Sequence, residues 1–580
     1  MNILRGFLKN KRINPKGTTV FFLLCLYTLL PFSPVMAENK YGGELVLTTT
    51  SDPKSFNPVL AKETSTTTIL APMFEGLTMT DPFDLRVKPN LAERWESDAQ
   101  GLIWTVYLRK NLFWSDGVPL TADDVIFTFN DLIFNDAVPN SSRDIFTIAG
   151  KPLRVEKVDD LTVKFILPVR FAPFLRSLGV EILPQHALQA SVKAGKFAFT
   201  WGIDTPVKEL VGTGPYRLKE YRPGQRLIYE PNPYYWKRSP EGERLPYISK
   251  LVYLIVPSLD VELLKFMEGS IDAYSLRGMD YPLLKPREQK GDFKIYNMGP
   301  DMGASFVVFN QNPGVNAKTG KPFVVSYKLA WFRDVRFRQA VAHAVDKKRI
   351  IEIVKNGLGY EQYSPESPSV GFFYCPDVKK YDYDLNKARA LLEEAGFSRD
   401  SSGVLKDKDG HAVEFNFYTN ADNTERVDIA SIIRNDLESL GMKVNLQLVE
   451  FNTLVGKLTS TYDWELIVLG LTGSIDPHFG QNVWLSSGQL HMWNPQQKTP
   501  ATEWEKKIDE IFAQGVQEMD ETKRKAYYDE YQKIIAEEVP LAYTALGARL
   551  TAVRNRFGNL KPAPYGGVFH NLEEIYIQQR

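Results

Sequence analysis

Cysteine is nearly absent from this 580-residue chain, which contains only Cys25 and Cys375. Cys25 lies inside an N-terminal apolar run that we expect to be removed with a signal peptide. The remaining chain then holds only Cys375 and cannot form an intramolecular disulfide. Stability must therefore come from a packed hydrophobic core, and a chain of this length can bury a large one. At this length we expect two or more lobes.

Long hydrophobic stretches are also missing beyond the N-terminus. Residues 1–37 predict a cleaved secretory signal, because basic residues precede the apolar run VFFLLCLYTLLPF and the small residues of VMA suit cleavage after Ala37. The run is too short, and too soon interrupted by proline, to span a membrane. We expect periplasmic export and no lipid anchor, since Cys25 lies within the run and follows the bulky Leu24.

Neither sign of charge dominates, since Lys and Arg number 70 and Asp and Glu also number 70. Removing residues 1–37 leaves 65 basic and 70 acidic residues, a formal charge of −5. That balance argues against nucleic acid as a partner. Aromatic residues make up 12% of the chain, enough to fill cores and also to line a pocket for an amphipathic organic ligand.

Catalytic motifs are missing as well. The sequence contains no P-loop, G-x-G-x-x-G, G-x-S-x-G or H-E-x-x-H, and its closest histidines, His478 and His491, lack metal-ligand spacing. We therefore assign no catalytic residue, metal or cofactor. SDPK at 51–54 and KTG at 318–320 match two boxes of penicillin-recognising serine enzymes, but both lie in turn-rich contexts. An exported hydrolase remains the rival hypothesis of another class.

Three aspartates lie near a tryptophan in LRKNLFWSDGVPLTADDVIFTFNDL, at 108–132, and paired carboxylates would suit glycoside hydrolysis. Local patterns favour a structural role for each aspartate. Upstream, the alternation of apolar and polar residues at 102–109 predicts a half-buried strand. The Asp-Gly at 116–117 is typical of a tight turn. Thr121 is predicted to cap a helix, Asp124 to complete a capping box, and Asp123 to favour the positive end of the helix dipole.

Strands alternate with helices in the second half of the chain, which predicts a mixed α/β lobe. The buried strand in WELIVLGLTG is followed by Asp476, at the end of the strand where such lobes commonly present ligands. Asp476 and the proline after it equally suit an ordinary turn. Trp464, Trp484 and Trp493 could wall a pocket or pack the lobe.

An ordered series of motifs extends over nearly the whole mature chain. Together these motifs resemble the family 5 extracellular solute-binding proteins, which include periplasmic oligopeptide-, dipeptide- and nickel-chelate-binding receptors of ABC importers. The motifs are MFEGL at 73–77, PNLAERWE at 89–96, LRKNLFWSDGVPLTADDVIF at 108–127, GTGPYRL at 212–218, NPYYW at 232–236, FRDVRFRQAVAHAVDKKRI at 332–350, KARALLEEAGF at 387–397 and IDP at 475–477.

The resemblance implies an α/β fold, namely the two-lobed periplasmic-binding-protein fold of type II, cluster C, with an extra subdomain in the first lobe. The lobes of such proteins close on a ligand about a hinge. In that family the Trp-Ser-Asp-Gly segment belongs to the scaffold. The implied boundaries are a signal peptide at 1–37, lobe I at 38–88, 208–305 and 544–580, the extra subdomain at 89–207, and lobe II at 306–543.

The resemblance also implies a ligand site. Peptide-binding relatives hold the ligand's amino terminus with an aspartate three residues before the Asp-Pro, but this position is Gly473 here and only Asp476 matches. Relatives also line the pocket from a loop equivalent to 62–65, and backbone groups at 471–474 would bind an extended peptide. The predicted ligand-binding residues are Thr64, Ser65, Trp464, Leu471, Thr472, Gly473, Ser474, Asp476 and Trp484.

The implied function is capture without chemistry. A monomeric receptor would bind peptides or a related small amphipathic solute and deliver them to an ABC-type membrane permease with its ATPase. A receptor for a sugar or metal chelate in the same fold is the alternative. In this hypothesis Asp476 neutralises a cationic group of the ligand, so Asp476→Ala is expected to weaken ligand binding without unfolding the protein.

Overall fold

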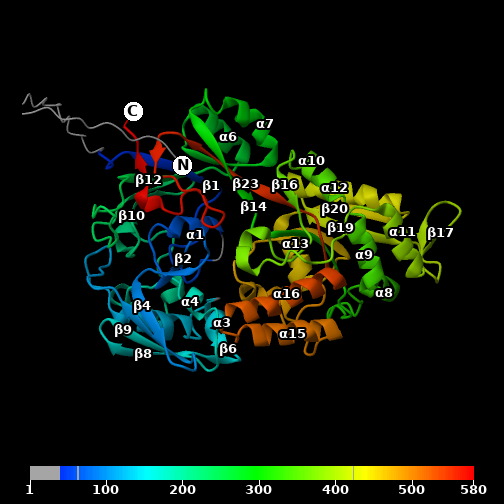
Figure 1. Cartoon of the computed structure of the whole chain (residues 1–580), viewed down its shortest axis with the longest axis horizontal. Helices are drawn as coiled ribbons and strands as arrows, with labels where there is room; N and C mark the ends of the chain where they lie inside the picture. Colours follow the sequence, from blue (N-terminus) through cyan, green and yellow to red (C-terminus); the bar gives the residue numbers. More distant parts are fainter. Residues whose placement is uncertain (1–38, 62–63, 141, 422, 580) are drawn as a thin grey trace, which may run out of the picture. The chain divides into compact units, whose positions relative to one another are not determined.

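The computed structural model describes residues 39–61, 64–140, 142–421 and 423–579. The predicted signal peptide and Cys25 lie outside these residues, as do positions 62 and 63 of the predicted pocket loop. Within the described segments no helix is long and apolar enough to cross a membrane. Lys40–Gln578 cluster as one unit of mixed helices and strands, and Cys375 is buried and free (Figure 1).

A four-stranded sheet brings together the start of the described chain and the region near residue 250. Its first strand alternates buried and half-buried residues, so Leu45 and Leu47 enter the core. This strand pairs in parallel with its neighbour, and the other pairs are antiparallel. In spatial order the strands are β1 (Glu44–Thr49), β12 (Lys250–Ile255), β11 (Arg226–Pro231) and β10 (Tyr216–Arg222).

A second, wholly antiparallel sheet lies within the predicted extra subdomain. It confirms the predicted strand before the Asp-Gly turn, since Trp104, Val106 and Leu108 are buried on one face. The strands are, in order, β4 (Ala92–Ser97), β5 (Ile103–Leu108), β9 (Thr162–Ile166) and β8 (Arg154–Asp159). Nearby in sequence are α2 (Ala122–Ile126), α3 (Ser142–Phe146), α4 (Phe174–Ser177) and α5 (Gln185–Lys193).

The predicted turn and capping box are confirmed. Gly117 has a φ of 91°, and the Trp114 amide donates to the Val118 carbonyl across the turn at 2.8 Å. Thr121 caps α2 by accepting a hydrogen bond from the Asp123 amide, while the Asp124 carboxylate accepts one from the Thr121 amide at 2.9 Å. The aspartates in this segment therefore position a turn and a helix.

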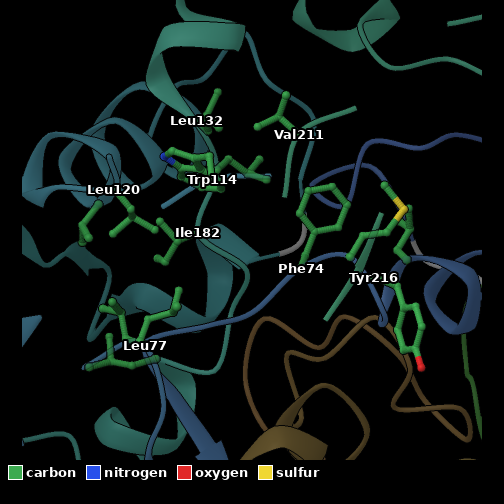
Figure 2. Close-up of a cluster of buried hydrophobic side chains, with 14 of the residues drawn as sticks. Phe74, Leu77, Trp114, Leu120, Leu132, Ile182, Val211 and Tyr216 are labelled. Atoms are coloured by element: carbon green, nitrogen blue, oxygen red, sulfur yellow. The ribbon is translucent and has the colours of Figure 1, made fainter. Parts of the chain in front are cut away.

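Trp114 is fully buried in the core beneath this segment. Figure 2 shows it beside Leu120, Leu132 and Ile182, among side chains from segments far apart in the sequence. The same cluster includes Phe74 from the MFEGL motif. The motifs at 73–77 and 108–127 thus meet in one core, which explains a structural role for both.

The C-terminal part of the chain returns to complete a third sheet. Figure 1 shows β23 beside β14 and β16, and each pairing is antiparallel. This return makes the sheet depend on strands distant in sequence. Its strands are β13 (Ala273–Leu276), β23 (Ala545–Arg554), β14 (Phe293–Pro300) and β16 (Gly359–Glu361), with α6 (Leu259–Glu268), α7 (Tyr281–Leu284) and α10 (Lys347–Ile353) nearby in sequence.

The remaining large sheet is mixed and has five strands. Its strand order is β20 (Lys443–Val449), β19 (Glu414–Asn420), β21 (Leu466–Leu471), β15 (Ala304–Phe309) and β22 (Leu541–Tyr543). Leu466 and Val468 of β21 enter one core cluster, whereas Ile467 and Leu469 enter another. Because β21 is buried on both faces, its sequence is a continuous apolar run, as the sequence predicts.

Helices and short hairpins complete the fold. The helices not yet named are α1 (Thr64–Leu70), α8 (Ser326–Arg333), α9 (Val335–His343), α11 (Leu385–Glu394), α12 (Thr424–Ser439), α13 (Phe451–Gly456), α14 (Gln481–Trp484), α15 (Glu503–Gly515) and α16 (Glu521–Glu538). Two-stranded pairs are β2 (Thr78–Thr80) with β3 (Val87–Pro89), β6 (Thr147–Ile148) with β7 (Lys151–Pro152), β17 (Ser398–Arg399) with β18 (Leu405–Lys406), and β24 (Phe557–Gly558) with β25 (Tyr576–Ile577). Short 3₁₀ turns lie at Phe197–Phe199, Val207–Glu209, Gly278–Asp280, Lys285–Arg287, Pro368–Phe373, Pro477–Gly480 and Leu572–Glu574, and π-helical turns at Phe127–Ile133 and Lys457–Thr461.

Arg338, an arginine of the 332–350 motif, has a structural role. It lies in α9, is 2% exposed, and donates to the carbonyls of Phe332, Glu538 and Val539. Burial lowers the pKa of Arg338 to about 10, so the side chain remains charged at neutral pH. It satisfies carbonyls at the ends of α8 and α16, which a helix leaves unpaired. The strands of the five-stranded sheet all fall between residues 304 and 543, while the exact lobe and subdomain boundaries stay predictions.

The capping box gives a test of the scaffold interpretation. Asp124→Ala leaves the backbone amides of Thr121 and Gln185 without their acceptor, so we expect a loss of about 1–3 kcal/mol in unfolding free energy. Asp123→Ala removes only an exposed ion pair with Lys157 and should cost less than about 1 kcal/mol. Urea denaturation of both variants measures the difference, and equal costs would contradict the capping role.

Candidate ligand-binding site

A cavity of about 1350 Å³ could hold a ligand. It exceeds the range of roughly 300–1,000 Å³ that is usual for drug-sized molecules, so it can accept a short oligomer. Its wall takes residues from β1, α1, β13 and β23, and from the C-terminal segment 565–573. Lys355, Glu425 and Ser474, from the region that contains the five-stranded sheet, also line it.

The segment that follows β21 lines this cavity at Ser474, and its backbone packs tightly against Met302 at the preceding residue, Gly473. A Cβ atom at Gly473 would lie 1.7 Å from the Met302 carbonyl oxygen, so no side chain fits at this position. The aspartate that the resemblance implies here for peptide-binding relatives is therefore sterically incompatible with this backbone. Gly473 can contribute to a site only through its own backbone groups.

Most of the predicted site residues meet at a second, smaller cavity of about 60 Å³. This volume suits a few water molecules or one small side chain. Ser474 lines both cavities and so lies where they adjoin. The predicted residues that line the small cavity are Leu471, Thr472, Gly473, Ser474, Asp476 and Trp484.

Asp476 is buried and already has a charged partner. Its two carboxylate oxygens accept hydrogen bonds from the two terminal nitrogens of Arg524, at 2.7 and 2.8 Å, and its side chain is 2% exposed. Burial acts to raise the pKa of Asp476, but Arg524 outweighs it and the net shift is downward. The carboxylate is ionised and held within the protein, so a ligand amine would have to compete with Arg524.

The other predicted residues lie in different surroundings. Thr64 is exposed and lines the large cavity, whereas Ser65 is half-buried and is not among its lining residues. Trp464 precedes β21, is 2% exposed, and packs in the hydrophobic core. Trp484 packs against Tyr531 with ring centroids 5.3 Å apart. The role of each of these residues in ligand binding stays a prediction.

The cavity wall contains an ionic cluster that sequence reasoning did not single out. The Lys237 ammonium lies 3.1 Å from Glu573 and 3.9 Å from Glu75, and the Trp236 indole donates to Glu75 at 3.0 Å. Burial raises the pKa of Glu75 to about 7. Glu75 belongs to the MFEGL motif and Lys237 directly follows NPYYW. Their positions in or beside these motifs are the only feature of the sequence that points to this cluster.

The two histidines that were considered as metal ligands lie in different surroundings, and the Nδ1 of His478 is buried without a hydrogen-bond partner among the described residues. His491 is fully buried between the Val483 carbonyl and Glu505, and His478 packs against Phe171. Among described residues, Asp407, Asp409 and His411 lie close enough together to hold an ion. The Asp407 carboxylate there accepts hydrogen bonds from backbone amides of its own turn, which accounts for the cluster structurally.

The two boxes of the rival hydrolase hypothesis occupy unsuitable local structures. Ser51 lies in an irregular segment after β1 and does not begin a helix. The KTG segment at 318–320 lies in a turn, with Gly320 at a φ of 68°. Serine enzymes of that class need the first box at a helix start and the third on a strand.

Comparisons with known proteins identify the family. The model of the bacterial extracellular solute-binding proteins, family 5 Middle, matches residues 86–491. A probable ABC transporter-binding protein of Deinococcus radiodurans is 30% identical over 533 residues, which cover 88% of this chain and 87% of that protein. A periplasmic alpha-galactoside-binding protein of Rhizobium meliloti is 24% identical over 547 residues, covering 88% of this chain and 77% of that protein.

A solved structure extends this likeness to the fold. The oligopeptide-binding protein AppA from Bacillus subtilis, in complex with a nonapeptide, matches with a TM-score of 0.73 and 26% identity over 93% of this chain and 100% of that chain. This likeness confirms the predicted α/β, two-lobed fold. Because the family model spans more than half of the sequence, this chain belongs to the bacterial extracellular solute-binding proteins of family 5.

Proposed function

We propose that this chain is the exported receptor of an ABC importer, which captures peptides and delivers them to a membrane permease. The observation that supports a peptide best is the backbone after β21. Among the described residues, the amides of 472–474 donate to no other backbone group, and this segment reaches the large cavity at Ser474. Such unpaired groups suit an extended peptide, which binds by strand-like hydrogen bonds whatever its side chains.

The size of the large cavity and the likeness to a nonapeptide-binding protein support the same ligand class. A sugar is the second candidate ligand, because one relative is an alpha-galactoside-binding protein. Binding without chemistry is supported by the state of Asp476, whose carboxylate is engaged by Arg524 and is not free to act as a base. In this proposal the chain acts by closing about the ligand, and the closed form docks on the permease.

Ligand that co-purifies with the native protein tests the proposal directly. We expect denaturing extraction followed by mass spectrometry to release a series of mixed short peptides, because backbone recognition tolerates many side chains. A single defined non-peptide solute would keep the fold and reject peptides as the substrate. A protein that releases nothing would be screened by thermal shift with tetrapeptide pools, since a bound ligand stabilises the folded state in proportion to its occupancy.

Gly473→Asp tests whether the aspartate of peptide-binding relatives can be restored. The new Cβ would overlap the Met302 carbonyl oxygen, so we expect a loss of about 1–3 kcal/mol in unfolding free energy and no gain in peptide affinity. Ser474→Asp places a carboxylate on the neighbouring residue as a control for added charge. Chemical denaturation and calorimetric titration measure the two effects. Tighter peptide binding by a fully stable Gly473→Asp protein would contradict the steric argument.

Asp476→Ala is now expected to affect folding as well as binding. It leaves Arg524 buried without its partner, which costs about 3–5 kcal/mol of unfolding free energy. Replacing both residues, as Asp476→Leu with Arg524→Met, should recover most of that loss because the pair is removed together. Peptide titration of the stable double variant then isolates any direct ligand role of Asp476. Unchanged peptide affinity would remove Asp476 from the site.

A further inference from the structure

We infer that Arg176 and Arg549, on the wall of the large cavity, form a subsite for an anionic group of the ligand. This inference rests on the proposed function and specifies it, because it predicts which terminus of a peptide the cavity recognises. Both arginines and Tyr565 line the cavity. The anionic group of a linear peptide that every such ligand shares is its terminal carboxylate.

The other long cationic side chains on the cavity wall are neutralised within the protein. Lys237 pairs with Glu573 at 3.1 Å, Arg277 with Asp280 at 2.8 Å, and Lys355 with Glu425 at 2.6 Å. Arg176 and Arg549 have no carboxylate within 4.0 Å among the residues that the structure describes. These two are therefore the guanidinium groups left to meet a charge that the protein does not supply.

Arg176 is held in place by neutral acceptors. From α4 it donates to the Thr80 hydroxyl at 3.1 Å and to the Leu85 carbonyl at 2.8 Å. The residue is half-buried, and burial lowers the pKa of Arg176, so part of its hydration is already lost. Asp476 contributes to its electrostatic surroundings, but both oxygens of that carboxylate are taken by Arg524.

Arg549 approaches the same loop from β23. Its guanidinium donates to the Pro564 carbonyl at 2.8 Å, and a Cβ at Gly567 would lie 3.3 Å from its other terminal nitrogen. Tyr565, between these two contacts, is also among the groups that influence Arg176 electrostatically. Arg549 is thus held against the loop at 564–567, and Tyr565 of this loop lines the same cavity as both arginines.

An unpaired guanidinium that is partly removed from water is costly unless an anion compensates it. Its planar fork of donors matches a carboxylate, to which it can donate two parallel hydrogen bonds. Carboxylates without a cationic partner also line the cavity, namely Glu262 and Asp301 in the described part of the chain. Unpaired charges of both signs suit a zwitterionic peptide better than a neutral sugar.

Two forms of one tetrapeptide pool test this subsite. The pool is prepared with a free terminal carboxylate and with a terminal amide, and both are titrated calorimetrically into the solute-free mature protein. We expect the amide pool to bind about 10- to 100-fold more weakly, the factor typical for loss of a hydrogen bond to a charged group. Arg176→Gln and Arg549→Gln should bind the acid pool more weakly and reduce this preference. Arg222→Gln is the control, since Arg222 is an exposed arginine outside the cavity.

The outcomes separate this inference from the proposed function. Peptide binding without an acid preference in the unmutated protein overturns the subsite and leaves the peptide receptor standing. A preference that persists in both glutamine variants also overturns it. Arg176→Lys, which keeps the charge and loses the fork, supplies a second variant if Arg176→Gln fails to fold, and the comparison of the two pools needs no variant.

If neither pool binds, the peptide function fails and inorganic phosphate becomes the probe. Thermal unfolding is then compared in phosphate and in chloride at equal ionic strength. A rise in melting temperature that is present in the unmutated protein and in Arg222→Gln, but lost in Arg176→Gln and Arg549→Gln, supports an anion subsite for another ligand. An equal rise in all four proteins is the general effect of phosphate on stability and overturns the subsite.

Discussion

A charge removed from water must find a partner, and this constraint governs much of the structure. Arg338 meets it with backbone carbonyls and thereby joins the ends of two helices. Asp476 and Arg524 meet it with each other, next to the strand end where a ligand was expected. Among the described residues of the cavity wall, the guanidinium groups of Arg176 and Arg549 and the carboxylates of Glu262 and Asp301 have no partner of opposite charge. In the proposed subsite the ligand supplies the charge that the two arginines lack.

The second constraint is close backbone packing around β21. This strand is buried on both faces, so its position is determined by two separate hydrophobic clusters. Its continuation passes within contact distance of Met302, which requires glycine at 473. A strand fixed in this way delivers unpaired backbone amides to the cavities without any mobile side chain. In the proposed function, recognition by these backbone groups would replace the aspartate that the family resemblance implies for peptide-binding relatives.

The carboxylates that first suggested a hydrolase show how local chemistry limits function. Asp124 gives its oxygens to two backbone amides, and Asp116 accepts from the amide of Val118 in the turn. These hydrogen bonds give each carboxylate a structural role in the turn or the helix start. The same reasoning applies to the acidic turn at Asp407, whose carboxylate is engaged by its own backbone.

The sequence by itself determined the features that depend on neighbours along the chain. Strand periodicity at 103–108, the capping box at Thr121 and the ordered motifs of the family all rest on local spacing, and all are confirmed. Only the tertiary structure decided the surroundings of the candidate site residues. It placed Arg524 on Asp476 across 48 positions, buried Trp464 in the core, and brought Arg176 and Arg549 to the wall of one cavity. Such contacts join residues far apart in sequence, and no local pattern encodes which distant side chain will neutralise a buried charge.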